Sequence, residues 1–227
     1  MKIKLYGNKR SIVRRRNKYY MKIIYIIRGD IIMKFISNHN QWLYKPSQFK
    51  IENESVQIIT QSRTDFWQRT YYGFQNDNAP ALLLPVADKY FSFVVKTEFN
   101  SKQRFDQCGV IIYQDSDNWF NASIEYENEE FQRLGSVVTN NGYSDWATTD
   151  IPATQKFMYY RLSRRESDFC IESSYDGISY KQMRIFHLFS GGEVVNVGIY
   201  ACSPENSSFC ANFTEIEFID CKWEEHK

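Results

Sequence analysis

The stretch FSFVVKTEF, residues 91–99, alternates large apolar side chains with smaller or polar ones. Phe91 and Phe93 fall on one side of this alternation, and Lys96 and Glu98 fall on the other. A period of two residues is the pattern of a β-strand that buries one face and exposes the other. The stretch therefore predicts a strand in a sheet with one face against a core.

Similar segments lie on both sides of this stretch. They span residues 56–61, 108–114, 119–126, 134–139, 157–164, 169–175, 194–202 and 212–219. Asp176-Gly177 lies between Tyr175 and Tyr180. It predicts a two-residue hairpin, because glycine accepts the positive φ that this turn needs. We expect roughly ten to twelve strands and no amphipathic helix, which indicates an all-β sandwich or barrel. The longest loops are expected at residues 76–89 and 140–156, and loops of this length commonly border a binding face.

The composition supports this class. The 227 residues include 17 Phe and 16 Tyr but only 10 Gly and 5 Pro, and aromatic enrichment favours strands. A chain of this length can bury one sizeable core, and we found no internal repeat or low-complexity linker. One main domain is therefore expected.

Residues 1–32 differ from the rest in charge, since they hold ten Lys and Arg and one acid, Asp30. The remaining residues carry a net charge of −8, which argues against affinity for nucleic acid or an anionic membrane. The apolar patch at 23–27 is too short for a spanning helix or a signal peptide. The segment could be a basic tail, a docking strand, or sequence upstream of the true start. We favour the last, with a single domain at 33–227 that begins at Met33.

The cysteines predict no metal centre. They show no CxxC pair and no histidine at ligand spacing, and no secretory signal precedes them. The five are Cys108, Cys170, Cys202, Cys210 and Cys221. Such a set predicts reduced, mostly packed thiols in the cytoplasm. The Asp115-Ser116-Asp117-Asn118 segment has oxygen ligands but is better explained as a turn. No cofactor is expected.

The run TDFWQRTYYGF, residues 64–74, is the strongest candidate for a recognition surface. Trp67, Tyr71 and Tyr72 could form a stacking platform, since each ring can cover roughly 150–250 Å² of a ligand or a core. If the run is a strand, Trp67 and Tyr71 share one face and Tyr72 points to the other. At least one of the three is then expected in the core.

Two acids lie beside tryptophans. Glu125 shares a predicted strand face with Trp119, and Asp145 directly precedes Trp146. A carboxylate beside an indole can hold a sugar, with the acid bonded to hydroxyls and the sugar stacked on the ring. The alternative is structural: Asp145 would cap a turn, and Glu125 would pair across strands with an arginine such as Arg161.

Catalytic groups are not evident. Glycoside hydrolysis needs two carboxylates that share one site, and the string Glu127 to Glu130 is better explained as a solvated turn. The three histidines are far apart in the sequence and lack the partners of a nucleophilic site. Gln107 and Arg69 could donate hydrogen bonds to a ligand, although bonds to the backbone are as plausible for each. A protein without catalytic residues is the favoured interpretation.

Several short sequence blocks occur in the same order as in one known protein family. They are TDFWQRT (64–70), YGF (72–74), FDQCGV (105–110), NW (118–119), IEY (124–126), SVVT (136–139), SDW (144–146), SYDG (174–177) and ACSP (201–204). From about residue 41 to 223 the chain resembles the family catalogued as domain of unknown function 1349, which includes proteins called regulators of enolase. The resemblance implies a jelly-roll β-sandwich of two curved antiparallel sheets, concanavalin A-like, of the lectin and glucanase superfamily. Tyr71 stands where relatives usually have His, and Asn121 where they usually have Lys.

These observations predict a non-catalytic protein that binds a carbohydrate or related polyol on a concave face. The candidate ligand-binding residues are Trp67, Tyr71, Tyr72, Gln107, Glu125, Asp145 and Trp146. The resemblance also allows a protein-interaction module that regulates a metabolic enzyme. A third hypothesis is an uncharacterised glycoside hydrolase, because the superfamily includes hydrolases. The Glu-x-Asp-x-x-Glu motif of laminarinase-like members is absent, and fold alone does not carry function.

Overall fold

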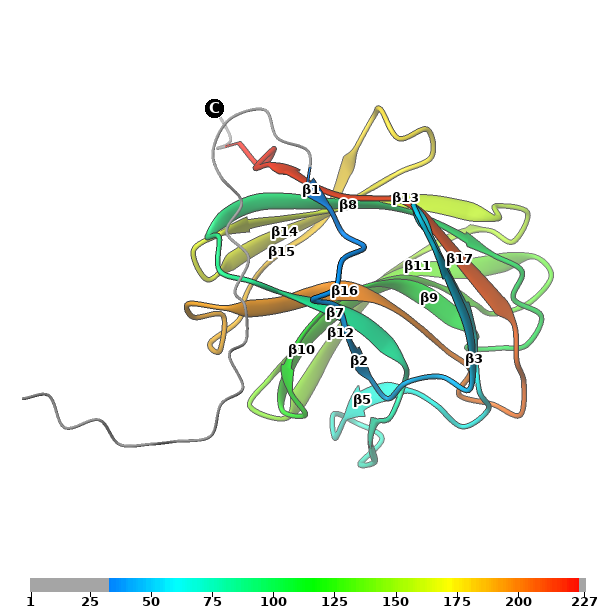
Figure 1. The fold of residues 1–227 in the computed structure, drawn as a ribbon. Coiled ribbons are helices and arrows are strands. Elements are labelled where there is room, and N and C mark those ends of the chain that lie inside the picture. The colour runs from blue at the N-terminus through cyan, green and yellow to red at the C-terminus, as the bar shows by residue number, and fades with distance from the viewer. Residues whose placement is uncertain (1–32, 225–227) are drawn as a thin grey trace, which may run out of the picture.

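A computed structural model describes residues 33–224, and every regular element within them is a β-strand (Figure 1). The predicted extension at 1–32 lies outside the described residues. Two large antiparallel sheets pack face to face and form a jelly-roll β-sandwich, as predicted. Residues 33–224 contain no helix that is long and apolar enough to cross a membrane.

One sheet has seven strands. In spatial order they are β12 (Tyr143–Pro152), β11 (Phe131–Asn140), β10 (Asn118–Tyr126), β9 (Gln107–Asp115), β16 (Val195–Cys202), β7 (Ala81–Val86) and β2 (Gln41–Leu43). The central strands are long and almost wholly buried, because this sheet is covered on both faces.

The other sheet has eight strands. In spatial order they are β15 (Lys181–His187), β14 (Asp168–Ser174), β13 (Phe157–Arg165), β8 (Tyr90–Phe99), β17 (Cys210–Asp220), β4 (Ser55–Ile59) and β3 (Gln48–Glu52), with β1 (Met33–Lys34) paired to β17. The alternation that predicted β8 is confirmed: Phe91 and Phe93 are fully buried between the sheets, whereas Lys96 and Glu98 are on the outer face and form an ion pair.

Aromatic rings join the two sheets. Phe93 packs on Phe218 at 4.8 Å between ring centroids, within the eight-stranded sheet. Phe120 of β10 stacks on Phe186 of β15 at 4.0 Å, which connects the sheets directly. Burial of such rings is the main favourable term for a sandwich of this kind.

Two predictions about connections are wrong. The expected loops at 76–89 and 140–156 contain β7 and β12, because pairing with neighbouring strands orders both segments. The hairpin at Asp176-Gly177 is longer than two residues: β14 ends at Ser174 and β15 begins at Lys181. The Asp176 side chain accepts hydrogen bonds from the backbone N–H groups of Ile178 and Ser179, and Gly177 takes a positive φ of 75°.

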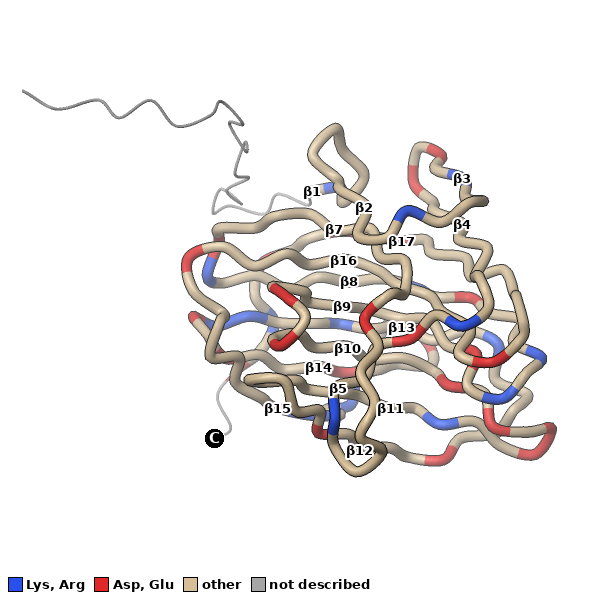
Figure 2. The backbone as a smooth tube through the Cα atoms, turned by 90° about the horizontal axis from the view of Figure 1, so that it is seen from below, with Lys and Arg blue, Asp and Glu red and all other residues tan. Residues whose placement is uncertain are grey.

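A short hairpin covers the outer face of the seven-stranded sheet. It consists of β5 (Phe66–Gln68) and β6 (Gln75–Asp77), which pair only with each other. Figure 2 looks at this face and shows the hairpin segment in front of the sheet, with acidic and basic residues interspersed. Phe66 anchors it, since its ring packs against Trp119 at 5.5 Å and Tyr200 at 5.8 Å. The hairpin thereby walls off a space above the sheet.

Candidate binding site

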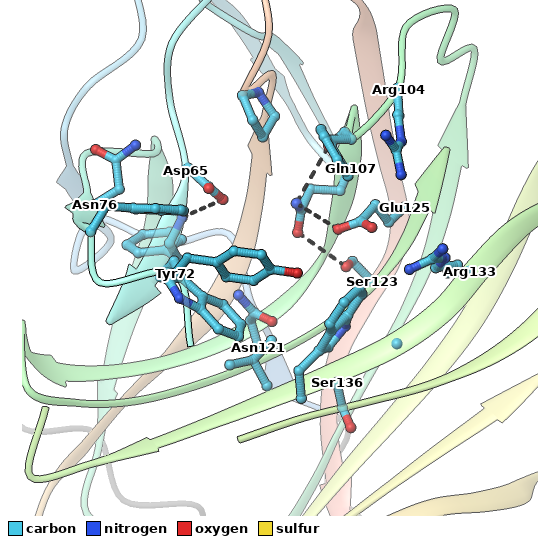
Figure 3. A pocket seen from close by; sticks show the side chains of 18 of the residues that line it. Asp65, Tyr72, Asn76, Arg104, Gln107, Asn121, Ser123, Glu125, Arg133 and Ser136 are labelled. Carbon is cyan, nitrogen blue, oxygen red and sulfur yellow. Dashed lines mark hydrogen bonds between the residues drawn. The ribbon is translucent and has the colours of Figure 1, made fainter. Parts of the chain in front are cut away.

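A cavity of about 570 Å³ lies between this hairpin and the outer face of the seven-stranded sheet (Figure 3). Its volume is within the range of small-molecule sites. The floor comes from β9, β10, β11 and β12, one wall comes from residues 65–76, and the far rim includes Arg104 and Glu205.

Strand β10 presents alternate residues to the cavity. Asn121, Ser123 and Glu125 line it, and the residues between them belong to the core between the sheets. Trp119 is on the same face, as predicted, but it is fully buried beneath the hairpin and does not line the cavity. The period of two is therefore unbroken from Trp119 to Glu125.

Register places three polar residues in one row across the floor. Gln107 of β9 is opposite Glu125 of β10, and Arg133 of β11 is opposite Glu125 on its other side. Residues directly opposite each other in antiparallel strands have Cβ atoms about 4.5–5.5 Å apart. The row is thus fixed by backbone pairing before any ligand binds.

Hydrogen bonds fix the Gln107 amide. Its Oε1 accepts from the buried Tyr200 hydroxyl at 2.9 Å and from Ser123 Oγ at 3.4 Å. Its Nε2 then donates to Glu125 Oε2 at 3.3 Å and to the Phe105 carbonyl at 3.4 Å. Gln107 orients Glu125 at the cavity floor, so the predicted ligand donor is already engaged with protein groups.

Glu125 is an unusual acid. Burial, followed by the negative charge of Asp65, raises its pKa to about 8, although Arg133 and Arg104 act in the opposite direction. Its Oε1 is enclosed and has no hydrogen-bond partner among the described residues. The alternative, a cross-strand pair with an arginine such as Arg161, is not found. Arg161 lies on the other sheet and binds Glu172, and Arg133, which is opposite Glu125, pairs with Glu127.

Asp65 is the second carboxyl on the cavity. It lies in the loop before β5, and its Oδ1 accepts a hydrogen bond from the backbone N–H of Phe66 at 2.8 Å. Burial raises its pKa to about 6, while that hydrogen bond acts to lower it. Both carboxyls therefore hold protons more tightly than free acids do.

These shifts predict how stability depends on pH. A carboxyl whose pKa is raised by folding binds more protons in the native state, so the free energy of unfolding should fall as pH rises from about 4 to about 8. Asp65→Asn should flatten the lower part of this window and Glu125→Gln the upper part. Chemical denaturation at a series of pH values measures both slopes, and a stability that rises from pH 6 to pH 8 in the native chain but not in Glu125→Gln would contradict the assignment.

Aromatic side chains of the hairpin and of β12 together form an aromatic wall along one side of the cavity. Trp67 meets Trp146 edge to face at 6.4 Å and Tyr72 at 5.5 Å, and all three line the cavity. Tyr71 does not: it is 92% exposed and packs only on the outside of Tyr72. Figure 3 shows the Tyr72 hydroxyl extending into the cavity.

The predicted alternation in this run is wrong. Strand β5 ends at Gln68, and residues 69–74 form a turn with positive φ at Arg69, Tyr71 and Gly73. The backbone therefore turns back, which places Tyr72 beside Trp67 and leaves Tyr71 in solvent. Arg69 also lies outside the cavity, since its Nη1 binds Asp117 and the Gly142 carbonyl.

The side chains of Asp145 and Trp146 lie on opposite faces of β12. Trp146 lines the cavity, whereas the Asp145 side chain is 79% exposed and pairs with Arg184 at 3.0 Å. Adjacent residues of β12 point to opposite faces, which is why only one of them reaches the cavity. The alternative that Asp145 caps a turn is also wrong, because the residue lies within β12 and its carboxylate pairs with Arg184.

The turn expected at residues 127–130 is present between β10 and β11, and residues 128–130 are exposed, but Glu127 itself is not solvated. The Glu127 side chain is 10% exposed and pairs with Arg104 at 2.6 Å and with Arg133 at 3.4 Å. The Arg133 guanidinium in turn lies over the Trp146 ring at 5.4 Å. Both arginines line the cavity, and Glu127, which lies outside it, balances one of their two positive charges.

Sequence reasoning missed several lining residues. Asn121 and Ser123 could have been found by extending the alternation from Glu125 along the strand. Asp65, Arg104 and Arg133 could not, because their approach depends on strand register and on how the hairpin folds over the sheet.

The part of the chain that the structure describes holds no group of three or more His, Cys, Asp and Glu side chains placed to bind a metal ion. In the Asp115 segment the carboxylate accepts hydrogen bonds from the Asp117 N–H and the Asn118 side chain, which is a turn. The described cysteines are all free.

The family model described as "Protein of unknown function (DUF1349)" matches residues 42–221. The yeast Saccharomyces cerevisiae protein named "Regulation of enolase protein 1" is 29% identical over 174 residues, which cover 77% of this chain and 86% of that protein.

Solved structures agree on the fold. A functionally unknown protein from Saccharomyces cerevisiae superposes with a TM-score of 0.74 and 28% identity, over 80% of this chain and 96% of that one. A xylan β-1,4-xylosidase from Bacillus halodurans superposes with a TM-score of 0.64 and 14% identity, over 86% of this chain but 39% of the xylosidase. At that identity the likeness shows a shared fold alone.

Proposed function

We propose, from the premise that this chain belongs to the DUF1349 family of proteins of unknown function, that its cavity binds a carbohydrate or a related polyol without cleaving it. The observation that carries the proposal is the pairing of an aromatic wall, Trp67, Tyr72 and Trp146, with the polar floor of β9 and β10. Sugars have apolar C–H faces and hydroxyl edges, and this lining offers a surface for each.

The floor supports the proposal with hydrogen-bonding groups of both kinds. The Asn121 amide can donate and accept, and the Ser123 hydroxyl, whose proton is directed at Gln107 Oε1, can accept. The described residues give no hydrogen bond to the Asn121 side chain, so its full capacity is available to a ligand. The xylosidase, by its name, acts on a sugar polymer, and part of it has this fold.

Trp146→Ala should weaken sugar binding by at least about tenfold, since stacking on an indole contributes on the order of 1.4 kcal/mol or more. Isothermal titration with a panel of mono- and oligosaccharides measures it, and Tyr71→Ala is the matched control because that ring lies outside the cavity. An unchanged affinity in Trp146→Ala, or no binding of any sugar by folded protein, would count against the proposal. NMR of the bound sugar over hours should show unchanged anomeric signals, and product formation would instead favour a hydrolase.

The name of the yeast relative favours a second candidate, a module that regulates a metabolic enzyme by binding it. Tyr71, Tyr72 and Phe74 form an exposed aromatic tip on the hairpin that could contact such a partner. Pull-down with metabolic enzymes of the source cell tests it. Capture that is lost in Tyr71→Ala would support this candidate, and capture of no enzyme by the folded chain would oppose it.

A further inference from the structure

The carboxylates around the cavity differ in whether they have cationic partners. Glu127 pairs with Arg104 and Arg133, and Glu205 lies 3.7 Å from Arg63. Asp65 and Glu125 line the cavity, and neither forms an ion pair with any described residue.

These two carboxyls approach the same hollow from different elements. Asp65 enters from the loop before β5 and Glu125 rises from β10, and Figure 3 shows both directed toward the space between the hairpin and the floor. Loss of hydration raises the pKa of each carboxyl, and the negative charge of Asp65 raises the pKa of Glu125 further. Both side chains are partly buried. Two carboxyls in such a site, neither of them in an ion pair, are costly to ionise together unless a cation binds between them.

We propose that the missing partner is the ammonium group of the ligand, so that the cavity is a site for an amino sugar. The ammonium would lie between Asp65 and Glu125, and the sugar ring would stack on the Trp146 indole. The inference rests on the proposed carbohydrate binding and narrows it to one chemical class. An ammonium supplies three donors, and both carboxyls have an oxygen that accepts no hydrogen bond from the described residues, Oε1 of Glu125 and Oδ2 of Asp65.

The aromatic wall favours the same ligand. The faces of Trp67, Tyr72 and Trp146 carry negative electrostatic potential and attract cations. The two arginines of the lining share one carboxylate, Glu127, so a single positive charge is left against the two carboxyls Asp65 and Glu125 when both are ionised. The hollow between Asp65 and Glu125 is therefore the acidic part of the cavity.

Binding of a cation should be coupled to proton release. Glu125 is largely neutral at pH 7 and must ionise to bind an ammonium, so affinity should rise with pH. The groups that face Glu125 are Asp65, Arg104, Glu127, Arg133, Gln107 and Tyr200. Release of one proton allows at most about tenfold per pH unit, and we expect at least about fivefold between pH 5.5 and pH 7.5.

Isothermal titration of the full chain tests the inference with four amino sugars, glucosamine, galactosamine, mannosamine and 6-amino-6-deoxyglucose, each beside its neutral parent hexose. At pH 7.5 at least one amino sugar should bind about tenfold or more tightly than its parent, as expected when a charged hydrogen bond is gained. Glu125→Gln, which copies the protonated acid, should reduce this preference to within about threefold and should leave only the weaker pH dependence that Asp65 contributes near pH 6.

Asp145→Asn is the matched control, because Asp145 is a carboxylate of the same sheet that lies outside the cavity. It should keep the full preference. Equal or tighter binding of the neutral hexoses would overturn the amino-sugar inference and leave carbohydrate binding standing. An affinity that falls between pH 5.5 and pH 7.5 would overturn it as well, and binding of no hexose at all would remove both proposals.

Discussion

Trp119→Ala should lower the free energy of unfolding by about 3–5 kcal/mol, the usual range for truncation of a fully buried tryptophan. The indole is fully enclosed between the seven-stranded sheet and the hairpin that covers it. Its ring packs on Phe66 at 5.5 Å, and its Nε1 donates to the Ser116 carbonyl at 3.2 Å. Truncation would leave a cavity beneath the hairpin and would remove the contact that anchors Phe66.

Urea denaturation followed by tryptophan fluorescence or circular dichroism measures the loss. Phe189→Ala is the control, since that ring is 72% exposed and its removal should change stability by less than about 0.5 kcal/mol. A loss below about 1 kcal/mol for Trp119→Ala would show that the hairpin does not depend on this ring. A folded Trp119→Ala variant should also bind sugar more weakly, because the wall that carries Trp67 loses its support.

Arg164→Met should be comparably destabilising, at roughly 3–5 kcal/mol, because one buried side chain holds several backbone carbonyls. Arg164 is fully buried, and burial lowers its pKa. Its Nε donates to the Glu166 carbonyl at 2.7 Å and its Nη1 to that of Asp88 at 3.0 Å. Its Nη2 donates to the carbonyls of Gly191 and Gly192. Methionine fills similar volume but satisfies none of these acceptors.

Lys181→Met is the matched control on an exposed position of β15, and it should leave stability nearly unchanged. Arg164→Lys should restore only part of the loss, because an ammonium cannot reach acceptors in several directions as a planar guanidinium does. Thermal or chemical denaturation separates these outcomes. Equal stability of the native chain and Arg164→Met would mean that the carbonyls find other donors.

The strand pattern of this chain was readable from its residues. Alternation alone located β8 and β10 and placed Trp119 and Glu125 on one face. It failed where pairing partners order a polar segment, as in β12, whose exposed threonines and acids read as a loop. A period of two reports burial of one face, and β12 is an edge strand with little to bury.

The candidate site was predictable in part. Of the seven predicted residues, five line the cavity, whereas Tyr71 and Asp145 do not. Tyr71 was misplaced because positive φ values in the turn break the alternation of a strand.

The sequence by itself determined the class of fold and which residues of β10 lie on its outer face, because period-two burial is a local property of the chain. Only the tertiary structure decided that Asp65 and Glu125 line one cavity and that Arg104 and Arg133 pair with Glu127. Residues 65 and 125 come to the same cavity through strand register and through a hairpin folded over a sheet, which depend on long-range contacts. No local pattern encodes such contacts, because burial and charge at the site arise only when distant segments pack together.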